Sequence, residues 1–198
     1  MRQAVSKAER TRSLIIEKTA DVFNRKGFAG TSLSDLTEAT GLTKGSIYGN
    51  FANKEEVAVA AFDFNCFKVM EIVRMQVDKA ATFQEKLLVH AKVYRKLLGP
   101  DFTGCPIQNT AIEADDTNPV LKARAAKALL KWEKSICRLV QAGILAGEFR
   151  KDVNVRQLAV SIVAIVEGGI MMSRVTNDSS CMNHVLGTVE ALISRISK

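Results

Sequence analysis

The sequence is poor in the residues that build disulfide frameworks, metal sites and nucleophilic centres. It holds four cysteines and two histidines in 198 residues, and no two cysteines have the CxxC spacing of a zinc or redox site. No nucleophile–base arrangement, phosphate-binding loop or metal-ligand spacing is present. We therefore expect no disulfide framework, no metal, no cofactor and no enzymatic activity.

Apolar segments of the kind that target or anchor a protein are also missing. The first residues, MRQAVSKAERTR, contain no apolar stretch, so we expect no signal peptide. The longest apolar stretch, Leu158 to Met172, is interrupted by Glu167 and is shorter than a membrane span requires. These two observations predict a cytoplasmic protein.

Acidic residues are too few to balance the basic ones. The net charge is +7, while apolar residues (47%) and charged residues (25%) stay in the range of soluble globular proteins. Residues 1–54 contain nine Lys or Arg and five Asp or Glu, so this quarter of the chain carries +4 of the excess. A basic N-terminal region favours a polyanionic partner such as nucleic acid.

Proline is rare, and long segments between the three prolines repeat apolar residues at helical spacing. No strand pattern or internal repeat is evident. Ser6 with Glu9 and Thr82 with Glu85 are capping-box pairs, and we expect Gly27 to end the first helix in the left-handed conformation. We predict an all-α fold of about nine helices. They should cover about 6–26, 32–40, 43–48, 53–79, 82–98, 107–115, 118–146, 154–174 and 179–196, with a loop over 99–106.

The segment TSLSDLTEATGLTKGSIYGNF, residues 31–51, predicts a helix-turn-helix. Two short helices joined at Gly41 follow a longer amphipathic helix, and the second short helix of such a unit enters the DNA major groove. The predicted small core consists of Leu33, Leu36, Ala39, Leu42 and Ile47. The predicted outward face consists of Lys44, Gly45, Ser46 and Tyr48.

These outward residues suit contact with DNA. A short Gly-Ser surface allows close approach to base edges, and Lys44 can donate to guanine acceptors or to phosphate. Phosphate contacts are expected from Thr31, Tyr48, Asn50 and Lys54. A helical hairpin that merely packs, or a helical protein-interaction module without DNA binding, is the alternative. It does not explain a small polar face beside a basic flank.

The run GFAGTSLSDLTEATGLTKGSIYGNFANKEEV resembles the DNA-binding motif of the TetR/AcrR family of regulators, over residues about 10–57. The resemblance implies that Lys44, Gly45 and Ser46 read bases. It implies backbone contacts from Thr31, Thr43, Tyr48, Asn50 and Lys54. The family often has His where Asn50 stands and a bulkier residue at Gly49.

The same resemblance implies a DNA-binding domain over 1–54 and a ligand-binding and dimerisation domain over 55–198. The expected protein is a ligand-responsive regulator, in the first instance a repressor. It would bind a double-stranded, palindromic operator as a homodimer and be released by a small-molecule effector.

Two apolar helices near the C-terminus are the candidate dimer interface. The first contains Gly168 and Gly169, each at a cost of about 1 kcal/mol relative to Ala inside a helix, which suggests close helix approach or room for a ligand. The resemblance implies that both helices pair with their copies, an ordinary monomer core being the alternative. The candidate interface residues are Leu158, Ile162, Ile165, Gly169, Val185, Val189, Leu192 and Ile193.

Candidate effector contacts are residues with a polar or polarisable group in an apolar helical context. They are Phe62, Cys66, His90, Tyr94, Cys105, Glu113, Trp132, Glu167 and Met171. A satisfied core or interface residue is the simpler interpretation of each. A carboxylate on an apolar face needs a partner, and for Glu113 and Glu167 that partner is expected to be Arg174, Arg124 or a cationic ligand.

Cys105 raises an alternative function. It stands in a Gly-Cys-Pro loop that enters a helix, and a helix N-terminus lowers the pKa of a thiol and makes it reactive. Some regulators of this family with a similar loop respond to electrophiles or oxidants. The alternative is therefore a thiol- or electrophile-sensing regulator acting through Cys105, although a small packing residue is the simpler interpretation.

Overall fold

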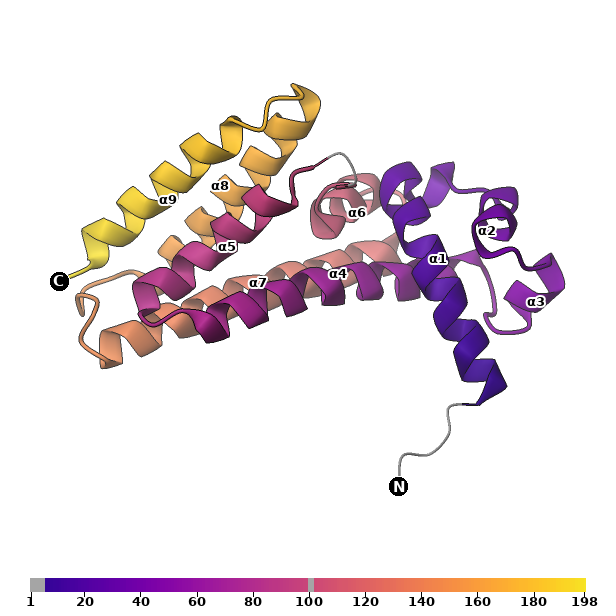
Figure 1. The fold of residues 1–198 in the computed structure, drawn as a ribbon, viewed down its shortest axis with the longest axis horizontal. Coiled ribbons are helices and arrows are strands. Elements are labelled where there is room, and N and C mark those ends of the chain that lie inside the picture. The colour runs from indigo at the N-terminus through magenta and orange to yellow at the C-terminus, as the bar shows by residue number, and fades with distance from the viewer. Residues whose placement is uncertain (1–5, 100–101) are drawn as a thin grey trace. The chain divides into compact units, whose positions relative to one another are not determined.

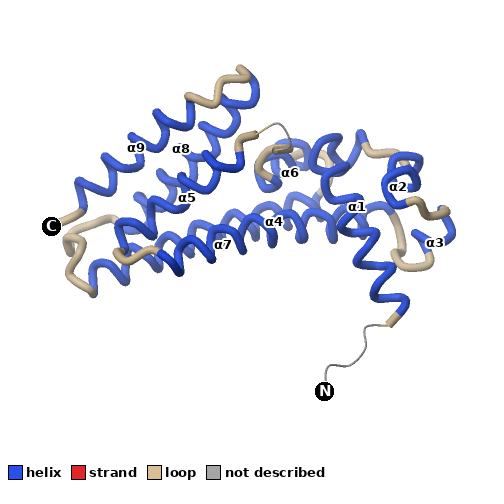
Figure 2. The backbone as a smooth tube through the Cα atoms, in the orientation of Figure 1, coloured by secondary structure: helices blue, strands red, loops and turns tan. Residues whose placement is uncertain are grey.

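The computed structural model describes residues 6–99 and 102–198, and within these ranges helices are joined by loops and turns, with one isolated β-bridge between Phe149 and Ser197 (Figures 1 and 2). The helices in the described ranges are α1 (Lys7–Gly30), α2 (Leu33–Thr40), α3 (Lys44–Tyr48), α4 (Lys54–Lys79), α5 (Phe83–Leu97), α6 (Pro106–Ala114), α7 (Pro119–Leu145), α8 (Val155–Val175) and α9 (Cys181–Ile196). The predicted all-α fold is confirmed. Part of the loop expected at 99–106 lies outside the described residues.

Local side-chain caps fix where most helices begin. Ser6 with Glu9, Ser32 with Asp35, and Thr82 with Glu85 form reciprocal capping boxes, which satisfy backbone amides that the first helical turn leaves without partners. Each such cap contributes about 1 kcal/mol to helix stability. The last helix differs, because Ser180 makes no side-chain cap to α9.

The break in α1 at Gly27 differs from the prediction. Gly27 has φ 73° but ψ 176°, so it does not adopt the left-handed helical conformation that was expected to end the helix. This backbone region is open almost only to glycine. One further turn follows before Thr31, so α1 reaches Gly30 as two helical pieces joined at Gly27.

The chain forms two compact units. Unit 1 contains the residues up to Lys68 together with Pro106–Ala125, and unit 2 contains Val69–Cys105 together with Ala126–Lys198. The boundaries between the units therefore fall inside α4, between Cys105 and the first residue of α6, and inside α7. The functional boundary predicted after residue 54 stays a prediction.

Unit 1 is built on α1, which packs against α2 and α6, while α3 packs on α2 (Figure 1). Ile15, Leu36 and Ile47 are completely buried in its core, beside Phe51 and Val57. Full burial of one such aliphatic side chain contributes about 1.5–3 kcal/mol. The core therefore holds the short helices α2 and α3, which are too short to be stable alone.

In unit 2, α8 packs against α9, and α5 packs against both (Figure 1). Glycine allows two close approaches there. A Cβ at Gly143 would overlap the ring of the fully buried Phe149, and a Cβ at Gly169 would lie 2.7 Å from Met182 Sδ. Both positions require the absence of a side chain for packing.

Helix α8 is longer than the apolar stretch that the sequence suggested. It has 21 residues and is long and apolar enough to cross a membrane, with 44% of its most apolar window buried within the chain. The expectation that this segment is too short is therefore wrong on length. One such helix is weak evidence of a membrane span, because core helices of soluble proteins share these properties.

Candidate functional sites

The helix-turn-helix geometry depends on Gly41 and Thr43. Gly41 follows α2 with φ 68° and ψ 14°, a left-handed conformation that favours glycine, and its N–H donates to the Thr37 carbonyl at 2.9 Å. Thr43 then caps α3 by accepting from the Ser46 N–H at 3.2 Å. Two local hydrogen bonds and the left-handed conformation of Gly41 therefore end α2, turn the chain and begin α3.

The sequence of α3 separates into a buried side and an open side. Ile47 is completely buried, whereas Lys44 and Gly45 are exposed and Ser46 and Tyr48 are half-buried. Nothing except the neighbouring Thr43 hydroxyl, at 3.9 Å, lies within van der Waals reach of a Cβ built on Gly45. The open side thus presents a small, polar surface beside one lysine, the composition that allows an approach to base edges.

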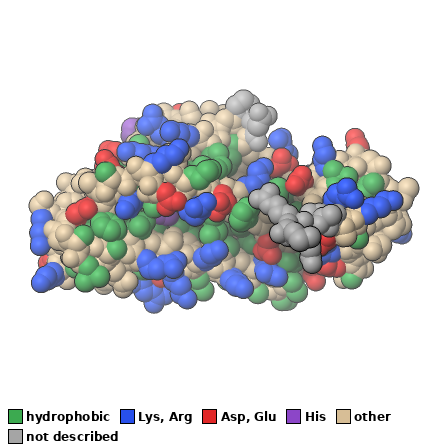
Figure 3. Space-filling model, turned by 60° about the horizontal axis from the view of Figure 1, so that its bottom comes forward, with side chains coloured by type: hydrophobic (Ala, Val, Ile, Leu, Met, Phe, Trp, Pro, Cys, Tyr) green, Lys and Arg blue, Asp and Glu red, His purple; other side chains and the backbone are tan. Residues whose placement is uncertain are grey.

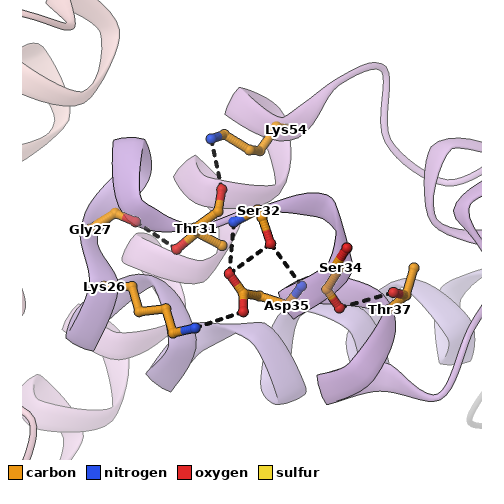
Figure 4. Close-up of polar contacts among 8 residues, drawn as sticks. All are labelled: Lys26, Gly27, Thr31, Ser32, Ser34, Asp35, Thr37 and Lys54. Carbon is orange, nitrogen blue, oxygen red and sulfur yellow. Dashed lines mark hydrogen bonds and ion pairs between the residues drawn. The ribbon is translucent and has the colours of Figure 1, made fainter.

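Thr31 and Lys54 are already engaged within unit 1 (Figure 4). The Thr31 side chain is 1% exposed, and its hydroxyl donates to the Gly27 carbonyl at 2.6 Å. Lys54 Nζ donates to the carbonyls of Phe28 and Thr31 at 2.7 and 2.8 Å, which uses two of its three N–H groups. In this conformation both side chains hold the α1–α2 junction, and a phosphate contact from Thr31 requires its present bond to break.

The start of α2 carries a further electrostatic contact (Figure 4). Asp35 accepts from Lys26 Nζ at 2.6 Å and from both the amide and the hydroxyl of Ser32. The hydrogen bond from Lys26, followed by those from Ser32, lowers the pKa of Asp35 to about 2. Asp35 therefore stays ionised at every pH at which the protein would be studied.

Arg12 is a residue that the sequence did not single out. Its guanidinium lies 3.9 Å from the centroid of the Phe51 ring, donates to the Asn50 carbonyl, and pairs with Glu56 at 2.6 Å. Glu56 in turn accepts from the Ala52 N–H at 2.7 Å. Arg12 thus connects α1 with the end of α3 and the start of α4. No local spacing could reveal it, because its partners lie 38 and 44 residues away.

Asn50 closes the C-terminal end of α3. Its side-chain N–H donates to the Ser46 carbonyl at 2.8 Å. The residue is half-buried, and its second amide hydrogen remains a donor that the expected phosphate contact would use. That contact stays a prediction.

Glu113 on α6 has a different partner from those expected. Its carboxylate accepts from the backbone N–H groups of Phe28 and Ala29, both at 2.8 Å, directly after the break at Gly27. Arg124 instead pairs with Asp63, and Arg174 donates to the Phe102 carbonyl. The prediction of Arg124 or Arg174 as the partner of Glu113 is therefore wrong, because the break in α1 exposes two amides that a carboxylate can bind.

Unit 2 brings together five of the nine candidate effector residues. Trp132 on α7 donates its indole N–H to His90 Nδ1 on α5 at 3.0 Å, and its ring lies 5.4 Å from that of Tyr94. The Tyr94 hydroxyl lies 3.8 Å from Cys105 Sγ. These contacts form one buried polar chain inside an apolar core.

The chain continues from Cys105 to Glu167 on α8. The Cys105 thiol donates to Glu167 Oε1 at 3.0 Å. Burial raises the pKa of Glu167 to about 7, and the thiol hydrogen bond opposes this rise. The carboxyl group is thus divided between its neutral and charged forms near neutral pH.

The remaining candidate effector residues lie elsewhere. Phe62 and Cys66 are buried in the part of α4 that belongs to unit 1. Glu113 also belongs to unit 1, and Met171 is 47% exposed on α8. Among the described residues, no three His, Cys, Asp or Glu side chains come together to hold a metal ion.

The predicted dimer residues lie mostly inside the protomer. Leu158, Ile162, Gly169, Val189 and Ile193 are buried within the single chain, and Ile165, Val185 and Leu192 are half-buried. Their apolar stripe is used in the packing of α8 with α9 and α5. The opposite face of α8 is the one left open, with Val160, Met171 and Val175 exposed by 46, 47 and 78%.

Positive charge is not confined to the helix-turn-helix. Figure 3 shows Lys and Arg side chains spread over the displayed face, with apolar side chains exposed between them. Lys44 on α3 and Lys127 on α7 are both exposed. The basic balance of the sequence therefore does not locate a nucleic-acid interface by itself, and contact of α3 with DNA stays a prediction.

Comparison with known proteins agrees with this geometry. Residues 15–61 match the family described as "Bacterial regulatory proteins, tetR family", and residues 85–189 match "Tetracyclin repressor-like, C-terminal domain". The chain is 24% identical over 185 residues to the HTH-type transcriptional repressor DhaR of Mycobacterium sp. (strain GP1), with 92% of each protein covered. It is 27% identical to the transcriptional regulator TtgR of Pseudomonas putida, with 96% of this chain and 91% of that protein covered.

Solved structures show the same relationship. A TetR-family transcriptional regulator from Cytophaga hutchinsonii superposes with a TM-score of 0.95 at 48% identity, covering 98% of both chains. A TetR regulator from Chloroflexus aurantiacus gives a TM-score of 0.90 at 37% identity, covering 96% of this chain and 98% of the other. Such proteins are DNA-binding regulators and not enzymes. With a matched family domain at each end and these close structural relatives, the chain belongs to the TetR family of bacterial transcriptional regulators.

Proposed function

We propose that the protein is a ligand-responsive repressor that binds a palindromic operator as a homodimer and is released by a small-molecule effector. The observation that carries the proposal is the open side of α3, where Lys44 and Gly45 are exposed and Ser46 is half-buried, above an apolar core. The Mycobacterium relative is named a repressor, which favours repression over activation. A regulator of this kind works on chromosomal DNA, so we place it in the cytoplasm.

The open face of α8 supports the homodimer. Val160, Ala164, Gly168, Met171 and Val175 follow one another at helical spacing along this face. A Cβ at Gly168 would meet nothing within 4 Å, and the same holds for Gly187 on α9. A second copy covering this face would form an isologous interface, and two-fold symmetry then predicts half-sites about 34–36 Å apart.

The Glu113 contact suggests how effector binding in unit 2 could alter DNA binding by unit 1. Cys105, which lies between Tyr94 and Glu167 in the polar chain of unit 2, immediately precedes Pro106, the first residue of α6. Near the other end of α6, Glu113 binds the two amides that follow the break in α1. An effector that displaces Cys105 would therefore pull on α6 and weaken the contact between α6 and the end of α1.

The operator should be found by selecting binding sites from random duplex DNA at a stated, near-physiological salt concentration. Recovery of a palindrome is the expected result. Recovery of non-specific DNA alone, also from refolded protein that carries no co-purified ligand, would contradict the proposal.

Lys44→Ala should lower operator affinity by about 5- to 150-fold, because the loss of one good base contact costs about 1–3 kcal/mol. If Lys44 contacts phosphate instead, all sequences should weaken alike and the salt slope should fall by about one. Fluorescence anisotropy at several salt concentrations separates these outcomes. Lys127→Ala, which removes an exposed lysine from α7, is the control with the same change in charge. Equal effects of the two substitutions on operator affinity would argue against α3 as the recognition helix.

A second candidate function is a thiol- or electrophile-sensing regulator acting through Cys105. The observation in its favour is that Cys105 lies between Tyr94 and Glu167 and directly before α6. Against it, the thiol is completely buried, and the Glu167 carboxylate disfavours a thiolate beside it. The geometry therefore favours a reversible ligand.

Cys105→Ser separates the two candidates, since a serine hydroxyl can still donate to Glu167. We expect the variant to keep its operator affinity and its response to a reversible effector. Operator release should be followed with and without N-ethylmaleimide, and Cys181→Ser serves as the control for the half-buried cysteines. If maleimide releases the wild type and the Cys181 variant but not the Cys105 variant, the thiol sensor is correct and the reversible pocket is not required.

A further inference from the structure

His90 on α5 is held in one tautomer by its neighbour. The side chain is 3% exposed, and the Trp132 indole N–H points at its Nδ1 from 3.0 Å. An indole nitrogen can only donate, so Nδ1 must be the acceptor and carries no proton. Burial lowers the pKa of His90 to about 4, so the ring is neutral at physiological pH. The single ring proton therefore lies on Nε2.

This fixed N–H donor has no hydrogen-bond acceptor among the residues that the structure describes. A buried donor without an acceptor costs about as much as a desolvated polar group, and native proteins rarely leave one in that state. Its surroundings are apolar and aromatic. The ring centroids of His90 and Trp132 lie 6.4 Å apart, with an angle of 27° between the ring planes, and Tyr94 packs on the Trp132 ring. Leu87 and Ala91, also on α5, are completely buried. The donor is thus placed to fix the orientation of an apolar molecule.

We propose that His90 Nε2–H donates to the effector, which is a small, largely aromatic molecule carrying an uncharged acceptor such as a ketone, ester or amide carbonyl. This proposal rests on the effector-binding role given to unit 2 above. We take the acceptor to be uncharged, because a buried anion needs a cationic partner and the polar chain contains none. Glu167, at the far end of that chain, would also repel an anionic ligand when it is ionised. A cationic group is excluded at this position because it needs a hydrogen-bond acceptor, whereas the His90 Nε2–H can only donate.

A matched pair of probes tests the class of ligand. Acetophenone and ethylbenzene have nearly the same shape, and only acetophenone carries an acceptor. Acetophenone should bind more tightly by roughly 5- to 30-fold, which is the effect of satisfying one buried neutral donor. Binding should be followed by NMR, through the indole N–H of the single tryptophan and the ring nitrogens of the two histidines. His184 is exposed on α9 and provides an internal control in every spectrum.

In the free protein, His90 should appear as the neutral Nε2–H tautomer, and acetophenone should shift its Nε2 resonance while His184 stays unchanged. His90→Phe should reduce the preference for acetophenone to about one, whereas His184→Phe should leave it intact. The tautomer and the shift are read from the wild type, so they test the proposal even if the His90 variant folds poorly.

Three results would overturn the inference. These are an Nδ1–H tautomer, equal shifts from the two probes, and no shift from either probe up to its solubility limit. Equal shifts would mean that an ordered water satisfies His90. None of these measurements involves DNA, so a failure of the operator model and a failure of this site are distinguishable.

Discussion

Gly27→Ala should abolish most operator binding and lower the free energy of unfolding by about 3–5 kcal/mol. A non-glycine residue at φ 73°, ψ 176° costs about 1–3 kcal/mol in backbone strain. In addition, the new Cβ would lie 2.7 Å from Glu113 Cδ, so the carboxylate would have to leave the amides of Phe28 and Ala29. Hydrogen bonds to a charged group contribute about 1.5–3 kcal/mol when buried, and less here because Glu113 is half-exposed. Urea denaturation and operator titration measure the two effects.

Gly30→Ala is the matched control for this substitution. It changes the same residue type in the same helix, but its Cβ would meet only Lys26 Cβ at an ordinary 3.7 Å. The control should be neutral or slightly stabilising, since alanine is the better helix former. Glu113→Ala removes the carboxylate without the backbone strain and should fall between the two. If Gly27→Ala were as mild as Gly30→Ala, the break in α1 would not have the conformation described.

Gly168→Lys should convert the homodimer to monomers and weaken operator binding by more than 100-fold. A Cβ at Gly168 meets nothing within 4 Å inside the protomer, so the protomer itself should keep its stability or gain from the loss of a helical glycine. In the proposed dimer, the new side chain would place a charge in an apolar interface, where an unpaired buried charge is strongly unfavourable. Sedimentation equilibrium measures the oligomeric state and thermal unfolding the fold.

Lysine is chosen so that the test is not confused by charge. An added positive charge increases general attraction to DNA, so lost operator binding cannot be attributed to electrostatic repulsion. Leu145→Lys is the control, because Leu145 is 89% exposed at the end of α7 and lies outside the α8 face. A Gly168 variant that remains dimeric and binds its operator normally would show that this face is not the interface.

Features that depend on neighbours in the chain were predicted from sequence. The capping boxes at Ser6 and Thr82, and the glycine turn at Gly41, use partners three to four residues away. Apolar spacing of 3.6 residues then gave the helices, and the 31–51 motif gave the family. These features are local because helical hydrogen bonds and caps are themselves local.

Contacts between distant segments were decided only by the tertiary structure. Helix α8 has apolar residues on two faces, and periodicity alone cannot say which one meets α9 and α5, so the predicted interface stripe lay inside the protomer. The partners of Arg12 and Glu113 lie 38 to 85 residues away. Many groups could have paired with these charges. In the folded chain Arg12 contacts a backbone carbonyl and a carboxylate, and Glu113 contacts two backbone amides. The sequence by itself determined the helices and the helix-turn-helix motif, while burial and long-range hydrogen bonding determined which side chains remain available to bind DNA, effector or a second copy.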